Sequence, residues 1–330
     1  MSTPLLHVEN LTIDFDTHHG PVRAVDGVSF TLAEGETLGL VGESGCGKSV
    51  TSLALLGLIP VPPGRIVAGS VRFDGFECIG APEKTLRTMR GKAMSMIFQE
   101  PMTALNPVFT VGHQLVDVLR RHERLDRVQA RKRGVEMLER VGIPRAAERM
   151  AEYPHELSGG LRQRIMIAMA LACRPRLLIA DEPTTALDVT TQAQVLAEIR
   201  ELTEALGTAV ILVTHDLGVI AEVCDRVAVM YCGQIVEQAP VDAVFRQPRH
   251  RYTEGLVAAV PRIRELPVDR LPTIPGTVPE PGRWPSGCRF APRCAHADDA
   301  CRAEQPALRR TGEADVACLH PAGDGAGDTA

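Results

Sequence analysis

Short apolar runs separated by turn residues dominate the N-terminal part of the chain and predict β-strands. Glycine and Asp-Gly turns break these runs, which are Leu5–Val8, Leu11–Phe15, Val28–Leu32 and Ser70–Phe73. Thr37–Val41 is an unbroken apolar run, as expected for a buried strand. It leads through a glycine-rich loop into Ser49–Leu58, which we predict to be a helix.

The pattern becomes helical between residues 110 and 173 and then alternates. Three helices, punctuated by proline or glycine, are predicted at Val111–Arg121, Arg127–Val141 and Leu161–Cys173. Beyond them, strands and helices alternate at Leu177–Ala180, Thr191–Leu206, Ala209–Val213, Leu217–Val223 and Val227–Tyr231. Such alternation predicts an α/β fold with a mainly parallel sheet and helices on both faces. Residues 110–173, which precede this alternation, are then a helical insertion.

Prolines recur between Pro261 and Pro285 with few apolar residues among them, as in an extended linker. We therefore expect a main domain at residues 1–258, with a helical subdomain at about 100–173, and a proline-rich C-terminal extension at residues 259–330.

Composition and charge narrow the class of protein. Apolar residues make up 45% and charged residues 23% of the 330 residues, which is enough for a sizeable core. The net charge of -5 disfavours phosphate polymers, so nucleic acid is not expected as a partner. No apolar run reaches the roughly 18 residues of a spanning helix, and the start does not resemble a secretory signal. We expect a protein of the reducing cytosol, or one held on a membrane by a partner.

The glycine-rich loop has the spacing G-x-x-x-x-G-K-[ST] of a phosphate-binding loop: Gly42-Glu43-Ser44-Gly45-Cys46-Gly47-Lys48-Ser49. Its glycines let backbone N–H groups curl around phosphates, and the following helix, through Val50, adds the positive end of its dipole. We expect Lys48 to place a charge on the phosphates and the Ser49 hydroxyl to ligate Mg²⁺. The loop predicts a site for a nucleoside triphosphate.

The aliphatic strand at Leu177–Ala180 ends in two carboxylates, Asp181 and Glu182. A strand end beside a phosphate-binding loop is where a second Mg²⁺ ligand is expected, and we assign Asp181 to it, acting through water. Glu182 can then polarise the attacking water as a general base.

A third segment is more specific: Leu157-Ser158-Gly159-Gly160-Leu161-Arg162-Gln163. Ser158, Gly159 and Gly160 stand at the start of a predicted helix, where a hydroxyl and bare amides can bind a γ-phosphate. The segment resembles the LSGGQ-type motif of ABC ATPases, in which it covers nucleotide held by another subunit. Leu161 stands where glutamine is common. The resemblance implies a P-loop NTPase of the ABC type, with an antiparallel β subdomain and a helical subdomain.

Further loops match this family in the expected order. By resemblance, Gln99 reaches Mg²⁺ and the attacking water and links the site to a membrane partner. Asp188, in Ala186-Leu187-Asp188, crosses a dimer interface, and His215 contacts the γ-phosphate. Family members stack adenine on an N-terminal aromatic residue, for which Phe15 is the nearest candidate. However, the loop Asp16–Arg23 is longer than the common form. Contact of the base with that loop is therefore one alternative, and a place for Phe15 in the core is another.

Two stretches resemble the dipeptide and oligopeptide importer ATPases within this family: Gln99–Pro107 and Asp181–Thr190. The resemblance implies a subunit that hydrolyses ATP to power peptide import, held at the cytoplasmic face of the inner cell membrane by two permease subunits. It also implies a second ATPase subunit, identical or different, and an extracytoplasmic solute-binding protein that acts indirectly. Importer ATPases for nickel or glutathione share parts of these strings, and a soluble ABC ATPase without a transport role is a further alternative.

Four of the nine cysteines are spaced C-x5-C-x6-C-x16-C near the C-terminus: Cys288, Cys294, Cys301 and Cys318. Four thiolates in a proline-rich segment with few core residues predict a module organised by a metal. Peptide-importer subunits carry a similar extension, and in some it holds a [4Fe–4S] cluster. The spacing lacks the paired C-x2-C of zinc ribbons and so favours iron–sulfur, while Zn²⁺ or metal-free thiols are the alternatives. The roles of His296 and His320, near these cysteines in the sequence, stay open.

Overall fold

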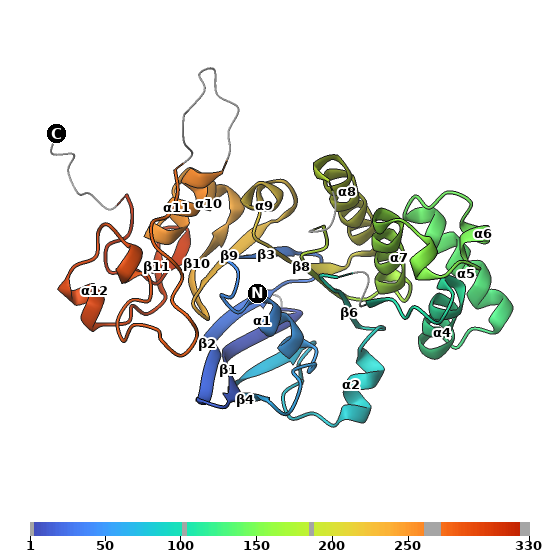
Figure 1. Ribbon diagram of the computed structural model, residues 1–330, viewed down its shortest axis with the longest axis horizontal. Helices are drawn as coiled ribbons and strands as arrows, with labels where there is room; N and C mark the ends of the chain where they lie inside the picture. The colour runs from blue at the N-terminus through green and yellow to red at the C-terminus, as the bar shows by residue number, and fades with distance from the viewer. Residues whose placement is uncertain (1–2, 101–103, 185–187, 261–271, 324–330) are drawn as a thin grey trace, which may run out of the picture. The chain divides into compact units, whose positions relative to one another are not determined.

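The computed structural model describes residues 3–100, 104–184, 188–260 and 272–323 (Figure 1). The chain forms two compact units. The first unit contains Ala33–Thr37 and Gly80–Leu212, and the second contains the residues up to Leu32, Leu38–Ile79 and the residues from Val213 onward.

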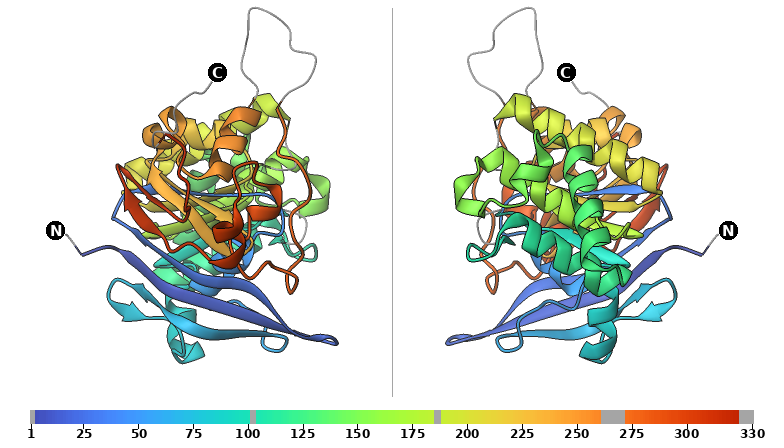
Figure 2. Two further views of the ribbon diagram at one scale, coloured as in Figure 1. Left: turned by 90° about the vertical axis from the view of Figure 1, so that its left-hand side faces the viewer. Right: turned by 90° about the vertical axis from the view of Figure 1, so that its right-hand side faces the viewer.

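A four-stranded antiparallel sheet in the second unit has the strand order β2-β1-β4-β5. Its strands are β1 (Leu6–Thr17), β2 (Gly20–Leu32), β4 (Gly64–Phe73) and β5 (Phe76–Glu77). The predicted loop at Asp16–Arg23 is wrong, because Thr17 pairs with Gly20 and Asp14 with Arg23 in a continuous hairpin. Figure 2 shows this long blue hairpin. The two short strands predicted at Leu5–Val8 and Leu11–Phe15 form one strand, β1, whose pairing with β2 shifts register between Val8 and Asp14.

The C-terminal residues extend a second set of strands in the same unit. β3 (Thr37–Val41) pairs in parallel with β9 (Arg226–Tyr231), which pairs with β10 (Gln234–Pro240) in an antiparallel manner. The short strands β12 (Ala314–Val316) and β11 (Arg309–Thr311) continue from β10. The helices of this unit are α1 (Lys48–Leu55), α9 (Leu217–Val223), α10 (Val241–Arg246), α11 (Arg251–Ala259) and α12 (Asp299–Ala303). The C-terminal extension is therefore an integral part of this unit.

The first unit combines a parallel strand pair with a group of helices. β6 (Met94–Ile97) pairs in parallel with β7 (Leu177–Asp181), and the chain leaves the unit within β8 (Ala209–Thr214). The helices are α2 (Glu83–Met89), α4 (Val111–Glu123), α5 (Arg127–Arg140), α6 (Ala146–Arg149), α7 (Gly159–Leu171) and α8 (Val189–Leu206). Leu115, Leu119 and Leu138 of α4 and α5 are fully buried, as the helical pattern predicts.

None of the described helices combines the length and the apolar composition that crossing a bilayer requires.

Candidate functional site

The phosphate-binding loop joins β3 to α1, and its path requires glycine at two positions. Gly42 has a φ of 155°, and a Cβ there would lie 2.2 Å from the carbonyl oxygen of Met230. Gly47 has a φ of 104°, and a Cβ there would lie 2.7 Å from the carbonyl oxygen of Ala24. Any larger residue would collide with backbone, so both positions depend on glycine.

Lys48 is only 5% exposed, and its ammonium group is held inside the loop. Its Nζ donates to the carbonyl oxygens of Gly42 at 2.7 Å and of Glu43 at 3.1 Å. Among the described residues, no side chain caps the start of α1, whereas Ser158 caps α7 and Asp188 caps α8. Backbone amides of an uncapped first turn, together with an ammonium group, are the groups that bind phosphate oxygens. The loop tip at Ser44 and Gly45 is exposed, so a ligand can reach it.

In the first unit, β7 ends in the predicted pair of carboxylates. Asp181 is 4% exposed. Glu182 follows with a φ of 46°, a left-handed conformation that costs free energy in a residue other than glycine and that clusters at functional sites. Gln99 Nε2 donates to Glu182 Oε2 at 2.9 Å. β6 and β7 pair in parallel up to Ile97 and Ala180. This pairing brings Gln99 and Glu182 together although they are 83 positions apart in the sequence.

The Leu157–Gln163 segment places two glycines, which have no side chains, in the first turn of α7. Ser158 is the N-cap, and its Oγ accepts from Leu161 N at 3.4 Å. A Cβ at Gly159 would meet no atom within 4 Å, and one at Gly160 would meet only Thr191 Cγ2, at 3.9 Å. Packing against the described residues does not require glycine at either position. Close approach of a molecule from outside is a physical reason for having both.

The remaining predicted residues lie at the ends of elements. Asp188 caps α8, accepting from Thr191 N at 3.0 Å, while Ala186 and Leu187 lie outside the described residues. His215 is exposed and directly follows β8. Phe15 is half-buried in β1 and pairs with Val22 of β2.

The structure brings the four C-terminal cysteines together. Cys288, Cys294, Cys301 and Cys318 line one cavity, with His250, Phe290 and His296 among the other lining residues. Burial raises the pKa of the Cys288 and Cys301 thiols, and it raises that of Cys318 to about 11. Four cysteine sulfurs that line one cavity are donors of the kind that Zn²⁺ and iron–sulfur clusters take once the thiols are deprotonated.

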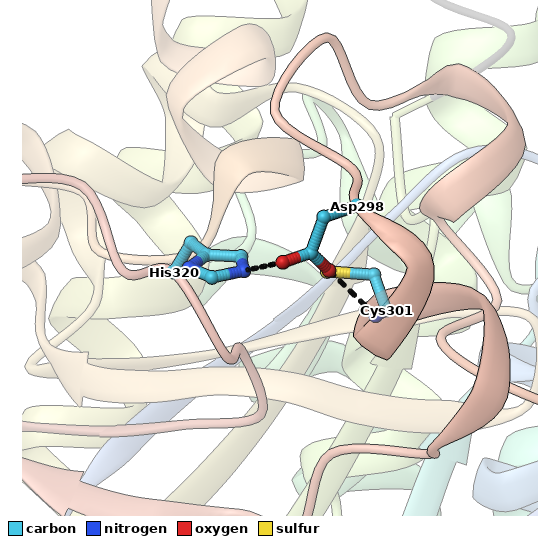
Figure 3. A group of neighbouring side chains, drawn as sticks. All are labelled: Asp298, Cys301 and His320. Atoms are coloured by element: carbon cyan, nitrogen blue, oxygen red, sulfur yellow. Dashed lines mark hydrogen bonds and ion pairs between the residues drawn. The ribbon is translucent and has the colours of Figure 1, made fainter.

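A carboxylate and an imidazole stand beside one of these cysteines (Figure 3). Asp298 Oδ1 accepts from Cys301 N at 2.8 Å, and Asp298 Oδ2 lies 2.8 Å from His320 Nε2. Ligand atoms of Asp298, Cys301 and His320 lie within 4.8 Å of one another. Hydrogen bonds to Cys301 and His320 lower the pKa of Asp298 to about 2. This mixed set of sulfur, oxygen and nitrogen donors suits Zn²⁺. In the sequence, the one signal that points to Asp298 is its place three residues before Cys301, and no role was predicted for it.

Arg293, for which no role was predicted from the sequence, contacts the phosphate-binding loop. Its terminal nitrogens donate to both carboxylate oxygens of Glu43, at 2.6 and 3.0 Å. The available signal was its position directly before Cys294.

Two family models match the chain. One, described as ABC transporter, matches residues 25–185, and the other, described as the C-terminal region of oligopeptide/dipeptide transporters, matches residues 236–301. The oligopeptide transport ATP-binding protein AppD of Bacillus subtilis is 53% identical over 93% of this chain and 93% of its own length. The dipeptide transport ATP-binding protein DppD of Escherichia coli is 46% identical over 98% of each chain.

Solved structures give the same result. The ATP-binding cassette MJ0796, in a dimeric post-hydrolysis state bound to ADP and Pi, is 26% identical with a TM-score of 0.65, over 72% of this chain and 98% of that chain. The predicted fold class is thereby confirmed. The chain belongs to the ATP-hydrolysing subunits of ABC transporters, in the oligopeptide and dipeptide transporter branch.

Proposed function

We propose that this chain binds and hydrolyses ATP to power the import of dipeptides or oligopeptides across the cytoplasmic membrane. The observation that carries the proposal is the match of residues 236–301 to the C-terminal region of oligopeptide/dipeptide transporters. The names of its relatives, which are peptide-transport ATP-binding proteins over nearly their whole length, support it.

The phosphates of ATP bind to the loop Gly42–Ser49, and the ammonium group of Lys48 neutralises part of their charge. Mg²⁺, when bound, stabilises charge on the phosphates. Ser49, Gln99 and Asp181 are its proposed ligands, because hydroxyl, amide and carboxylate oxygens are the donors that Mg²⁺ prefers.

Glu182 takes a proton from the attacking water. Its contact with Gln99 supports this role, because the amide N–H that donates to Glu182 Oε2 fixes the orientation of the carboxylate. His215 contacts the γ-phosphate. Phe15 stacks on adenine, for which a half-buried ring leaves surface available.

Two ATPase subunits assemble head to tail, so that Ser158, Gly159 and Gly160 of one cover the ATP held by the other, with Asp188 at the interface. The open space around Gly159 supports this arrangement. The second subunit is another copy or a different ATPase. Two permease subunits dock near Gln99 and hold the pair at the membrane surface, and a solute-binding protein delivers peptide to them.

We also propose that residues 1–258 form the nucleotide-binding domain, with its helical subdomain at about 100–173, and that residues 259–330 form the extension. Cys288, Cys294, Cys301 and Cys318 hold a [4Fe–4S] cluster, with Zn²⁺ as the alternative. That the four cysteines line one cavity supports a shared site, and all-thiolate ligation is a known form of both groups. The bound group would stabilise the module, and transport needs no redox step from it.

Reconstitution of the chain with its permease subunits and binding protein in vesicles tests this function. We expect ATP-dependent uptake of labelled dipeptides or oligopeptides, and no uptake when Lys48→Ala replaces the wild-type chain. Uptake of nickel or glutathione in place of peptide would contradict the peptide assignment. ATPase activity that permeases and peptide leave unchanged would contradict a transport role.

A further inference from the structure

The segment from Cys288 to Cys294 packs directly against the phosphate-binding loop. Arg293 is 7% exposed and makes a bidentate ion pair with Glu43, the second residue of that loop. Bidentate pairs between guanidinium and carboxylate fix orientation as well as charge, because both groups are planar. The two residues are 250 positions apart in the sequence.

Arg293 is itself held rigidly. Its Nε donates to the carbonyl oxygen of Pro275 at 2.8 Å, and a terminal nitrogen donates to Tyr231 Oη at 3.4 Å. The ion pair with Glu43 raises the pKa of the guanidinium, so its charge is permanent. In the same segment Phe290 packs on the rings of Tyr231 and Tyr252, with centroids 5.4 and 5.5 Å away. An anchored cation of this kind can set the position of its partner.

Glu43 connects three parts of the unit. Its side chain binds Arg293, its backbone N–H donates to Tyr252 Oη at 2.9 Å, and its carbonyl oxygen accepts from Lys48 Nζ at 3.1 Å. A shift of Glu43 would therefore move an acceptor of the lysine that we assign to the ATP phosphates. The side chain of Glu43 is 32% exposed, and the ion pair with Arg293 fixes the position of its carboxylate.

A second route leads from the same segment to the loop. Arg289 hydrogen-bonds the carbonyl oxygen of Cys232 and pairs with Asp26. Cys232 and Gly233, with φ angles of 46° and 80°, form the turn between β9 and β10. The N–H of Gly233 donates to the carbonyl oxygen of Cys46 at 2.9 Å. The segment thus contacts the loop directly through Arg293 and indirectly through Arg289.

We propose that Arg293 is a positioning residue for ATP, which orients the phosphate-binding loop through Glu43 and makes the affinity for ATP depend on the C-terminal module. The inference rests on the proposed binding of ATP at Gly42–Ser49. Arg293 acts on the loop and does not touch the reacting atoms.

The test is the equilibrium dissociation constant for ATP, measured on the full-length chain. For Arg293→Met we expect an increase of roughly 5- to 150-fold, the range typical of coupling between two sites. Arg293→Lys keeps the charge but loses the bidentate geometry, so its dissociation constant for ATP should lie between that of the wild type and that of Arg293→Met. The matched control is Arg302→Met in the same module, because Arg302 is exposed and its terminal nitrogen lies 3.3 Å from Asp299 Oδ1, a contact that does not involve the phosphate-binding loop. The control should bind ATP like the wild type.

A double substitution separates positioning from a general loss of structure. If Arg293 acts through Glu43, then Arg293→Met combined with Glu43→Gln should weaken binding no further than the stronger of the two single changes. Fully additive losses would overturn the proposal, as would wild-type affinity in Arg293→Met. If Arg293→Met fails to fold, Arg293→Lys and Glu43→Gln carry the test, and wild-type affinity in both would overturn it.

Metal content and thermal unfolding of every variant are measured in parallel. Weakened ATP binding with unchanged iron and zinc supports the role of Arg293. If ATP binding is weakened only in variants that have lost metal, the effect belongs to the cysteine site, and the proposed role of Arg293 is overturned. A wild-type chain without measurable ATP affinity would instead refute the proposed function.

Discussion

Replacing Glu182 with glutamine should separate ATP binding from ATP hydrolysis. Glutamine has the size of glutamate and keeps one oxygen that can accept from Gln99 Nε2, the contact now 2.9 Å long. Local structure and ATP affinity should therefore change little, while the basic carboxylate is lost. A positioned general base contributes about 10²- to 10⁴-fold to rate. At about 1.36 kcal/mol per tenfold, the activation barrier should rise by roughly 3–5 kcal/mol.

The assay is single-turnover release of phosphate, with the dissociation constant for ATP measured on the same preparation. The matched control is Glu201→Gln, an exposed position on α8 with the same change of charge. Hydrolysis by Glu182→Gln close to the wild-type rate would show that another group is the base. Loss of ATP binding together with hydrolysis would show that Glu182 serves to shape the site.

Three further substitutions test other parts of the account. Lys48→Ala should weaken ATP binding in a filter-binding assay, because the phosphates lose a buried cation, and unchanged affinity would count against the phosphate-loop assignment. Gly159→Ala should leave the thermal unfolding temperature unchanged or higher, because a Cβ there meets no atom of the described residues within 4 Å, yet it should slow hydrolysis by the assembled transporter. Normal hydrolysis would remove Gly159 from the ATP interface. In anaerobically purified protein, Cys318→Ser should abolish the broad absorption at about 400 nm that is expected of an iron–sulfur chromophore. Zinc without iron in the wild type would reject the cluster.

Local sequence patterns predicted several elements because burial and turn chemistry agree there. Thr37–Val41 and Leu217–Val223 are a strand and a helix with the predicted bounds. Both are mainly apolar segments with a clear boundary residue. Gly42 follows the strand, and Asp216 precedes the helix, so the apolar pattern and the turn or cap residue mark the same boundary. The glycine-rich loop was recognisable for a similar reason, since its backbone path permits only glycine at Gly42 and Gly47.

Other features depend on contacts that no local pattern encodes. The hairpin through Asp16–Arg23 consists largely of polar, exposed residues, which resemble a loop in sequence but pair in the sheet. The C-terminal strands are three residues long, too short to show a period. The ion pair of Arg293 with Glu43 joins positions that only the tertiary fold brings together.

The central claim is that the loop Gly42–Ser49 binds the phosphates of ATP in the presence of Mg²⁺. The most direct measurement is equilibrium binding of labelled ATP to the purified chain, with Lys48→Ala as the control. We predict saturable binding of one ATP per chain, competed by ADP and weakened in the control. Absence of binding, with the permease and ATPase partners present, would contradict the account.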